Sequence, residues 1–343
     1  MDVRGLIRHD IWQPGGRRIY FYGDFEPPPA GYHARPIAEP EYEPKWDPQR
    51  AAWMLAPAGP RRRSSLSSAK DCPLCPSRAD FSSEIPSSLF RIVVFDSRLV
   101  RLKPGRGASE VVVYTPEHDG SLASFNKRSI GHLVEVWRDR YEELASRPDV
   151  DYVFIFENRG EAAGGWPSHP HGEILGYPFI PPLAEVELRA ARAHRQKRGC
   201  LQCALIAAER RAKERLLFIA GGIAAYVPSY ARWPYETHVG PIEHCGDLND
   251  LSRDQCVALG QALQRVVLAY DRLFSQPMPY MMAMHQRPTD GRPHPEAHLH
   301  VEFYPVMRAA GRLKFLAGGE CGAGTFVSDG LPEEKAAELK RAL

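Results

Sequence analysis

The chain has 343 residues, 43% of them hydrophobic and 25% charged, so it is long enough for two ordinary globular domains. Its 44 basic and 42 acidic residues leave a net charge of +2, which gives no electrostatic reason to expect a nucleic acid or a membrane surface as partner. Asp2 and Arg4 stand where a targeting segment would be apolar, and no stretch approaches the roughly 18 apolar residues of a membrane span. We therefore expect a cytoplasmic protein with a small-molecule ligand.

Residues 1–69 are rich in Pro, Arg and Ser and predict an extended, loop-heavy lead-in. Beyond it, β-branched and aromatic runs alternate with helical spacing, which predicts an α/β or α+β fold. The expected strands are 91–95, 110–114, 152–156, 216–227, 281–285 and 298–303, and the expected helices are 130–144, 183–212 and 252–273. The second half repeats the plan of the first, so we expect one unit over 70–187 and another over 188–343.

Seven cysteines include two Cys-x-x-Cys pairs, Cys72/Cys75 and Cys200/Cys203. In a reducing compartment such pairs indicate metal or redox chemistry rather than disulfides. A redox motif should open a helix beside a βαβ unit, whereas prolines follow both cysteines of the first pair. Metal binding is the favoured interpretation.

The metal-capable residues of the two halves occur in the same order at a nearly constant shift of 126 to 129 residues. The first half has Cys72, Cys75, His118, His169, His171 and Glu173, and the second has Cys200, Cys203, His244, His298, His300 and Glu302. A shift this regular through six scarce residues predicts that one unit was duplicated.

Two thiolates and two imidazoles complete a tetrahedral zinc shell. The first half therefore predicts a closed structural zinc site made of Cys72, Cys75, His118 and His169. The second half offers a matching set, Cys200, Cys203, His244 and His298, whose alternative interpretation is a pair of small buried cysteines with surface histidines.

A strand period of two places His169, His171 and Glu173 on one face. If zinc holds His169, then His171 is held rigidly with one ring nitrogen free to attack an electrophile. The alternative is that His171 is a further metal ligand, because His-x-His pairs often bind one ion together.

A glycine-rich turn follows the expected strand that ends near Asn158. Its backbone amides, together with the Asn158 side chain, could bind phosphate oxygens. The glycines of this turn are Gly160, Gly164 and Gly165.

Several motifs in order resemble the galactose-1-phosphate uridylyltransferases of the histidine-triad superfamily. They are Cys-Pro-Leu-Cys at 72–75, Thr-Pro-Glu-His at 115–118, Glu-Asn-Arg-Gly at 157–160 and His-Pro-His-Gly at 169–172. The likeness extends over roughly residues 45–343. It implies two fused histidine-triad-like units, each an antiparallel sheet with flanking helices, in a protein that forms a homodimer.

The resemblance also implies chemistry. A histidine matching His171 attacks the α-phosphorus of UDP-glucose, releases glucose 1-phosphate and passes the uridylyl group to galactose 1-phosphate. The family's structural zinc matches the first Cys/His set. A second metal site of some members, zinc or iron, matches Glu187, His285, His300 and Glu302, and we treat it as competing with the second Cys/His set.

The substrate-binding residues of the family are matched less completely in this sequence. Asn158 matches a residue that contacts the nucleotide phosphates, Arg62 matches one of two phosphate-binding arginines, and Lys314 and Glu320 match residues that seat the sugar phosphate. Three positions depart from the family: Trp166 replaces a small hydroxyl residue near the phosphates, Gly59 replaces the other arginine, and Ser97 replaces an asparagine near the nucleoside. These changes indicate an altered substrate or weaker activity.

Glu173 departs from the family as well, since the family has a glutamine that donates to the phosphate. A carboxylate cannot donate unless it is protonated. An ionised carboxylate about 5 Å from a phosphate would cost roughly 3 kcal/mol per unit charge at an effective dielectric of 20. Either Glu173 is protonated, or it turns away, or the substrate differs.

Three functions remain as hypotheses. The first is a nucleotidyltransferase acting through His171, with a nucleotide sugar and a sugar 1-phosphate as partners. The second is a nucleotide-sugar or dinucleotide hydrolase or phosphorylase in which Glu173 orients water or phosphate. The third is a zinc-stapled protein that has lost its chemistry.

Overall fold

The computed structural model describes residues 2–3, 5–13, 17–24, 41–58, 72–97, 101–102, 105–165 and 168–343. The first half of the chain is mostly strands. They are β1 (Asp2–Val3), β2 (Leu6–Gln13), β3 (Arg17–Gly23), β4 (Glu41–Asp47), β5 (Ala52–Pro57), β6 (Ile92–Asp96), β7 (Arg101–Leu102), β8 (Ala108–Val113), β9 (Tyr152–Arg159) and β10 (His171–Tyr177). Every residue of β8 is buried, as in a strand that is covered on both faces.

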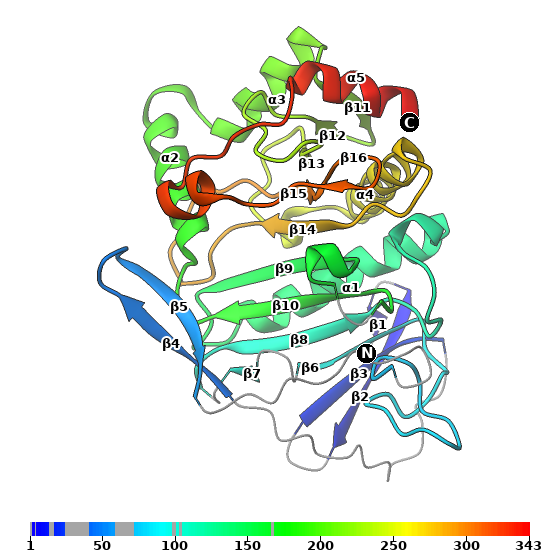
Figure 1. Ribbon diagram of the computed structural model, residues 1–343. Helices are drawn as coiled ribbons and strands as arrows, with labels where there is room; N and C mark the ends of the chain where they lie inside the picture. Colours follow the sequence, from blue (N-terminus) through cyan, green and yellow to red (C-terminus); the bar gives the residue numbers. More distant parts are fainter. Residues whose placement is uncertain are drawn as a thin grey trace.

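The second half adds β11 (Leu216–Ala220), β12 (Ile223–Tyr226), β13 (Thr237–Pro241), β14 (Tyr280–His285), β15 (His300–Pro305), β16 (Met307–Ala309) and β17 (Arg312–Leu313). One sheet of 12 strands runs through both halves in the order β1-β2-β3-β6-β8-β10-β9-β14-β15-β13-β12-β11. The halves meet where β9 pairs antiparallel with β14 (Figure 1). The expected antiparallel α+β fold is confirmed, and its two sheets are continuous.

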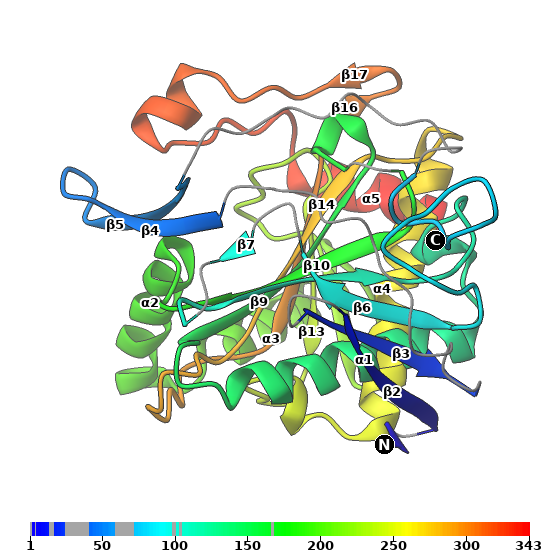
Figure 2. The same ribbon diagram turned by 90° about the horizontal axis from the view of Figure 1, so that it is seen from below.

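The helices are α1 (Lys127–Ala145), α2 (Pro182–Arg198), α3 (Leu201–Ala212), α4 (Arg253–Leu273) and α5 (Pro332–Ala342). Apolar residues of α1 and α4, such as the fully buried Trp137 and Tyr270, share one core with side chains from both halves of the sheet. Figure 2 shows α1 on one side of the strands and the β4–β5 hairpin on the other. No helix within the described ranges is long and apolar enough to cross a membrane.

Two expected elements are each divided by glycine. The expected helix 183–212 is two helices, because Gly199 has φ of 78° and Cys200 is extended before α3 begins. The expected strand 216–227 is the β11–β12 hairpin, whose turn is Gly221–Gly222 with φ of 55° and 79°. The expected domain boundary at 187–188 falls inside α2 and stays a prediction.

The expected lead-in was wrong for its first part. β2 and β3 form a hairpin that extends the main sheet, and Ile19 of β3 lies opposite Phe95 of β6. β4 and β5 form a second hairpin, in which Trp46 lies opposite Trp53. Composition concealed these strands because the prolines and arginines cluster in the segments between them, which lie outside the described residues.

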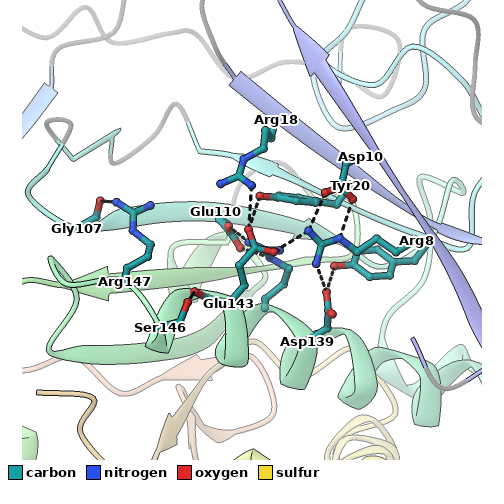
Figure 3. Close-up of polar contacts among 12 residues, drawn as sticks. Arg8, Asp10, Arg18, Tyr20, Gly107, Glu110, Asp139, Glu143, Ser146 and Arg147 are labelled. Carbon is teal, nitrogen blue, oxygen red and sulfur yellow. Dashed lines mark hydrogen bonds and ion pairs between the residues drawn. The ribbon is translucent and has the colours of Figure 1, made fainter. Parts of the chain in front are cut away.

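A network of charges fastens the β2–β3 hairpin to α1 (Figure 3). Arg140, 1% exposed, contacts Glu110 at 2.7 Å and Glu143 at 2.7 Å. Arg8 contacts the same Glu143 at 2.6 Å and Asp139 at 2.9 Å. Moving the hairpin would separate these charges and leave buried ones uncompensated, which is costly. The network therefore fixes the hairpin in one position.

Burial opposes ionisation of Glu143, but its contacts with Arg140 and Arg8 outweigh that effect and lower its pKa from 4.5 to about 2. A depressed carboxyl pKa contributes stability above pH 4.5 that is lost as the pH falls toward 2. We expect Glu143→Gln to lower the free energy of unfolding at pH 7 by about 1–3 kcal/mol and to weaken its pH dependence below 4.5. Urea unfolding at pH 7 and pH 4 measures both effects. The exposed neighbour variant Glu142→Gln is the control, and equal behaviour of the two variants would contradict the prediction.

Candidate functional site

The first Cys/His set comes together beside β10. Cys72 and Cys75 lie in the loop before β6, His118 follows β8, and His169 immediately precedes β10. Cys75 Sγ lies 3.3 Å from His118 Nδ1 and 3.6 Å from His169 Nδ1, and all four ligand atoms lie within 4.8 Å of one another. His169 Nε2 is 2.8 Å from the Thr115 carbonyl oxygen. Since a carbonyl only accepts, Nε2 carries the proton and Nδ1 is free to bind a metal.

The second set forms the same arrangement in the other half. Cys200 Sγ and Cys203 Sγ lie 3.3 Å and 3.5 Å from His298 Nδ1, and His298 Nε2 contacts the Pro241 carbonyl oxygen at 3.0 Å. The ring centroids of His244 and His298 are 5.4 Å apart at 77°, against 5.6 Å and 80° for the matching pair of the first half. Two thiols and two imidazoles thus converge twice, and both donor sets fit zinc.

A third group of metal-capable residues includes His300, which lies two residues after His298 of the second set. Glu187 of α2, His285 of β14 and His300 of β15 offer ligand atoms within 4.8 Å of one another. His285 Nδ1 is 2.8 Å from Glu187 Oε2, and the His285 and His300 rings stack at 5.0 Å. This group shares no residue with the second Cys/His set. Both sets therefore come together in the structure, and which of them holds the carboxyl-terminal metal stays a prediction.

Glu302 contacts Arg232 and Tyr304, and it forms a further metal-capable group with Glu236 and His238, two residues that sequence reasoning missed. Its Oε1 lies 3.2 Å from His238 Nε2, which also contacts Glu236 at 3.0 Å. Glu302 is farther from the third group, 3.5 Å from His300 and 3.9 Å from His285. The spacing of two residues between Glu236 and His238 could have identified them, since the same spacing pointed to His169 and His171.

The third group lines a cavity of about 300 Å³. One wall is polar and contains the third group with Glu302 and His238. Apolar residues of α2 and α3, among them Leu188 and Leu205, form the facing wall. The third group, Glu302 and His238 therefore line the same cavity.

His171 belongs to none of the metal-capable groups among the described residues. Its Nδ1 lies 2.7 Å from the carbonyl oxygen of His169, so Nδ1 carries the proton and Nε2 keeps its lone pair. Burial lowers the pKa of His171, although the backbone hydrogen bond opposes the shift. The imidazole is therefore neutral at pH 7 and suited to nucleophilic attack.

Glu173 and Asn158 lie on the same sheet face as His171. Glu173 lies opposite Phe156 across β10 and β9, and alternation places Asn158 beside that pair. Burial raises the pKa of Glu173 to about 7. Within the described ranges its carboxyl group has no hydrogen bond or ion pair, so nothing holds it in the ionised form.

The glycine-rich turn packs tightly against the end of β9. Gly160 and Gly164 have φ of 79° and 81°, and the Gly165 amide donates to the Gly160 carbonyl at 3.0 Å. A Cβ on Gly165 would overlap the backbone of Asn158. The turn therefore lies directly beside Asn158, but the amides of Gly164 and Gly165 donate within the turn, to the Glu161 and Gly160 carbonyls, so phosphate binding by these amides stays a prediction.

Two of the remaining expected positions, Lys314 and Glu320, lie close to each other. Lys314, 8% exposed, donates to the Val327 carbonyl and to Asp329 at 2.7 Å and 2.8 Å and lies 3.8 Å from Glu320. No hydrogen bond or ion pair among the described residues joins this group to His171. Ser97 is buried at the end of β6, and its amide donates to the Ser109 carbonyl. Arg62, Gly59 and Trp166 lie outside the described residues.

Comparison with known proteins agrees with this arrangement. Residues 91–181 match the galactose-1-phosphate uridyl transferase N-terminal domain, and residues 190–343 match its C-terminal domain. The galactose-1-phosphate uridylyltransferase of Thermotoga maritima is 34% identical over 315 residues, covering 86% of this chain and 97% of the relative. That of Haemophilus influenzae is 32% identical over 291 residues, covering 79% and 82%.

Solved structures share the fold. A uridylyltransferase structure superposes with a TM-score of 0.76 at 30% identity and covers 87% of this chain and 97% of its own. An ADP-glucose phosphorylase from Arabidopsis thaliana has a TM-score of 0.67 at 22% identity, with coverages of 88% and 98%. The second likeness is one of fold alone.

The raised pKa of Glu173 predicts that its ionisation lowers the free energy of unfolding. Its carboxyl ionises less readily in the folded than in the unfolded chain, so stability falls as the pH rises from 4.5 to about 7. We expect Glu173→Gln to raise the free energy of unfolding at pH 8 by about 1–3 kcal/mol and to have little effect at pH 4.5. Urea unfolding at both pH values tests this, with the exposed Glu161→Gln as control. A parent protein as stable at pH 8 as its Glu173→Gln variant would contradict it.

Proposed function

The chain belongs to the galactose-1-phosphate uridylyltransferase family, and from that membership we propose that it transfers a uridylyl group between hexose 1-phosphates through a covalent adduct on His171. The observation that carries the proposal is the bond from His171 Nδ1 to the His169 carbonyl, which leaves Nε2 unprotonated. The ligands are a nucleotide sugar and a sugar 1-phosphate, and the assembly is a homodimer, as the resemblance implies.

The reaction has two balanced steps. His171 Nε2 attacks the α-phosphorus of the UDP-sugar, the N–P bond forms, and the bond to the bridging oxygen breaks with release of sugar 1-phosphate. A phosphate oxygen of the second sugar 1-phosphate then attacks the same phosphorus and displaces Nε2. In the adduct the ring is cationic, and the His169 carbonyl stabilises it through the Nδ1 proton.

Glu173 is suited to this reaction in its neutral form. With a pKa of about 7, a substantial fraction of its carboxyl groups is protonated near neutrality and donates a hydrogen bond. The donor would be directed at a phosphate oxygen, as the glutamine of the family is. The ionised form would repel the phosphate by roughly 3 kcal/mol at 5 Å and a dielectric of 20.

We assign zinc to both Cys/His sets and a divalent cation to Glu187, His285 and His300. Zinc would supply structural cross-links, and in the first set it would hold His169 and with it the acceptor for His171. The third group and its surroundings contain three carboxylates, Glu187, Glu236 and Glu302, and one guanidinium, Arg232, which contacts Glu302 at 2.9 Å and Glu236 at 3.2 Å. Three negative charges against one positive leave two, which one divalent cation balances.

The transfer is tested by intact mass. After incubation with UDP-glucose, ADP-glucose or a GDP-sugar, we expect the parent chain to gain one uridylyl group with UDP-glucose and His171→Gly to gain none. Adding galactose 1-phosphate should discharge the adduct. Nucleotide release without a sugar acceptor would favour the hydrolase or phosphorylase instead, and no adduct or product with any donor would overturn enzymatic activity.

The metal assignment is tested by elemental analysis of the purified chain. We expect two zinc equivalents, of which Cys72→Ser/Cys75→Ser loses one and Cys200→Ser/Cys203→Ser loses the other. Only the first pair of changes should also slow adduct formation, by about ten-fold or more, since it releases His169. Cys321→Ser, at an exposed cysteine, is the control. Unchanged zinc content in either double variant would refute the corresponding site.

A further inference from the structure

Gly172 lies between the two residues that face the substrate, and its own missing side chain would point into the core. A Cβ at this position would overlap Tyr114 Oη and lie 3.0 Å from the Phe156 carbonyl oxygen. Gly172 does not have the positive φ that glycine alone favours, so contact, not backbone conformation, excludes a side chain here. The Tyr114 hydroxyl therefore fills the space directly behind the strand that carries His171.

Tyr114 is itself held firmly. Its ring packs edge-on against Trp137 of α1 at 6.1 Å and against Phe125 at 6.3 Å. Its amide donates to the Pro170 carbonyl at 3.0 Å, one residue before His171. Tyr114 thus contacts the nucleophile's strand through its hydroxyl, behind Gly172, and the residue just before that strand through its amide.

A buried carboxyl group lies on the same side. Glu157, 5% exposed, accepts a hydrogen bond from the Tyr280 hydroxyl at 2.8 Å. Burial raises its pKa to about 7, although Tyr280 and Tyr114 oppose the shift. Within the described residues, Glu157 Oε2 and Tyr114 Oη form no hydrogen bond of good geometry. Tyr114 therefore keeps its position mainly by packing, with the carboxyl group nearby as a polar neighbour.

The duplicated half is an internal comparison. The residue that matches Gly172 is Val301, fully buried, and its partner across β13 is Val239. His300, which matches His171, also has its Nδ1 near the carbonyl two residues before it, at 2.9 Å. It nevertheless lies in the Glu187 and His285 group. The pairing of glycine with a tyrosine hydroxyl thus occurs in the half whose histidine is free to react.

We infer that Tyr114 is a positioning residue for His171, acting through the space that Gly172 leaves open. The inference rests on the proposed function, because it assumes that His171 is the nucleophile. Tyr114 presses on the strand from the core side while the His169 carbonyl holds the imidazole, and together they fix Nε2 relative to the phosphorus. Tyr114 lies on the opposite face from His171 and does not touch the substrate.

The consequence concerns rate rather than binding. Removing the hydroxyl leaves a gap behind Gly172 into which the strand relaxes, and small misplacements of a reacting group cost up to about 10²-fold in rate. We expect Tyr114→Phe to slow adduct formation about ten-fold with KM for UDP-glucose unchanged. Gly172→Ala should be slower still, because its methyl group overlaps the hydroxyl.

The decisive measurement combines the two changes. In Tyr114→Phe/Gly172→Ala the methyl group occupies the space of the missing hydroxyl, so we expect adduct formation about ten-fold faster than in Gly172→Ala alone. If Tyr114 and Gly172 acted on the rate independently of each other, the two losses would add. Val239→Ala, which makes a cavity opposite Val301 in the other half, is the control and should leave the rate unchanged. A double variant no faster than Gly172→Ala would overturn the inference.

A second readout separates this inference from the proposed function. The ¹⁵N shifts of the His171 ring, assigned by comparison with His171→Gly, report which nitrogen carries the proton without any turnover. We expect Tyr114→Phe to reduce the Nδ1-protonated population, because the bond to the His169 carbonyl loosens. If the parent forms no adduct, the proposed function fails, while the ring shift still supports positioning. An unchanged ring signal in Tyr114→Phe would overturn positioning even if the parent transfers uridylyl groups.

Discussion

The hydrogen bond between His171 Nδ1 and the His169 carbonyl is the interaction on which the proposed chemistry depends. It couples a residue of the first Cys/His set to the nucleophile over two positions of one strand. The acceptor is a backbone carbonyl just before β10, and the neighbouring Pro170 carbonyl accepts from the Tyr114 amide, so this segment is held against the sheet. The imidazole is thus oriented by the same sheet that gathers the metal-capable residues.

The two duplicated halves hold equivalent histidines, His171 and His300, in the same way but in different surroundings. Both halves place an imidazole two residues after a Cys/His-set histidine and fix its Nδ1 by the same backbone contact. In the first half His171 is buried and outside every metal-capable group of the described residues, and Glu173 on the same face has no hydrogen bond or ion pair among them. In the second half His300 faces Glu187 and His285, and carboxylates close the site to a phosphate. On the proposed function, the surrounding charges, rather than the histidine, would decide between nucleophile and metal ligand.

The sequence predicted the parts of the molecule that depend on periodicity and scarce residues. A constant shift identified both Cys/His sets, and period two placed His171 and Glu173 on one face. It placed His298 and His300 in separate sets, but it did not predict that both sets come together in one structure, because that depends on how β14, β15 and α2 pack. It also missed Glu236 and His238, whose partner Glu302 belongs to a strand about 65 residues away in sequence and directly opposite in the sheet. Lys314 and Glu320 lie 3.8 Å apart. Their position relative to His171 could not be predicted from the number of residues between them.

Glu173 connects the departure from the family to a physical cause. A glutamine donates at every pH, whereas this carboxyl donates only when protonated, and burial alone brings its pKa to about 7. A bound nucleotide sugar adds negative phosphates nearby, and a like charge raises a carboxyl pKa further. Binding would therefore recruit the proton that the donor needs, and the complex would keep Glu173 neutral at a pH where the free protein has begun to ionise it. On this account the substitution preserves the donor but makes its presence depend on the ligand.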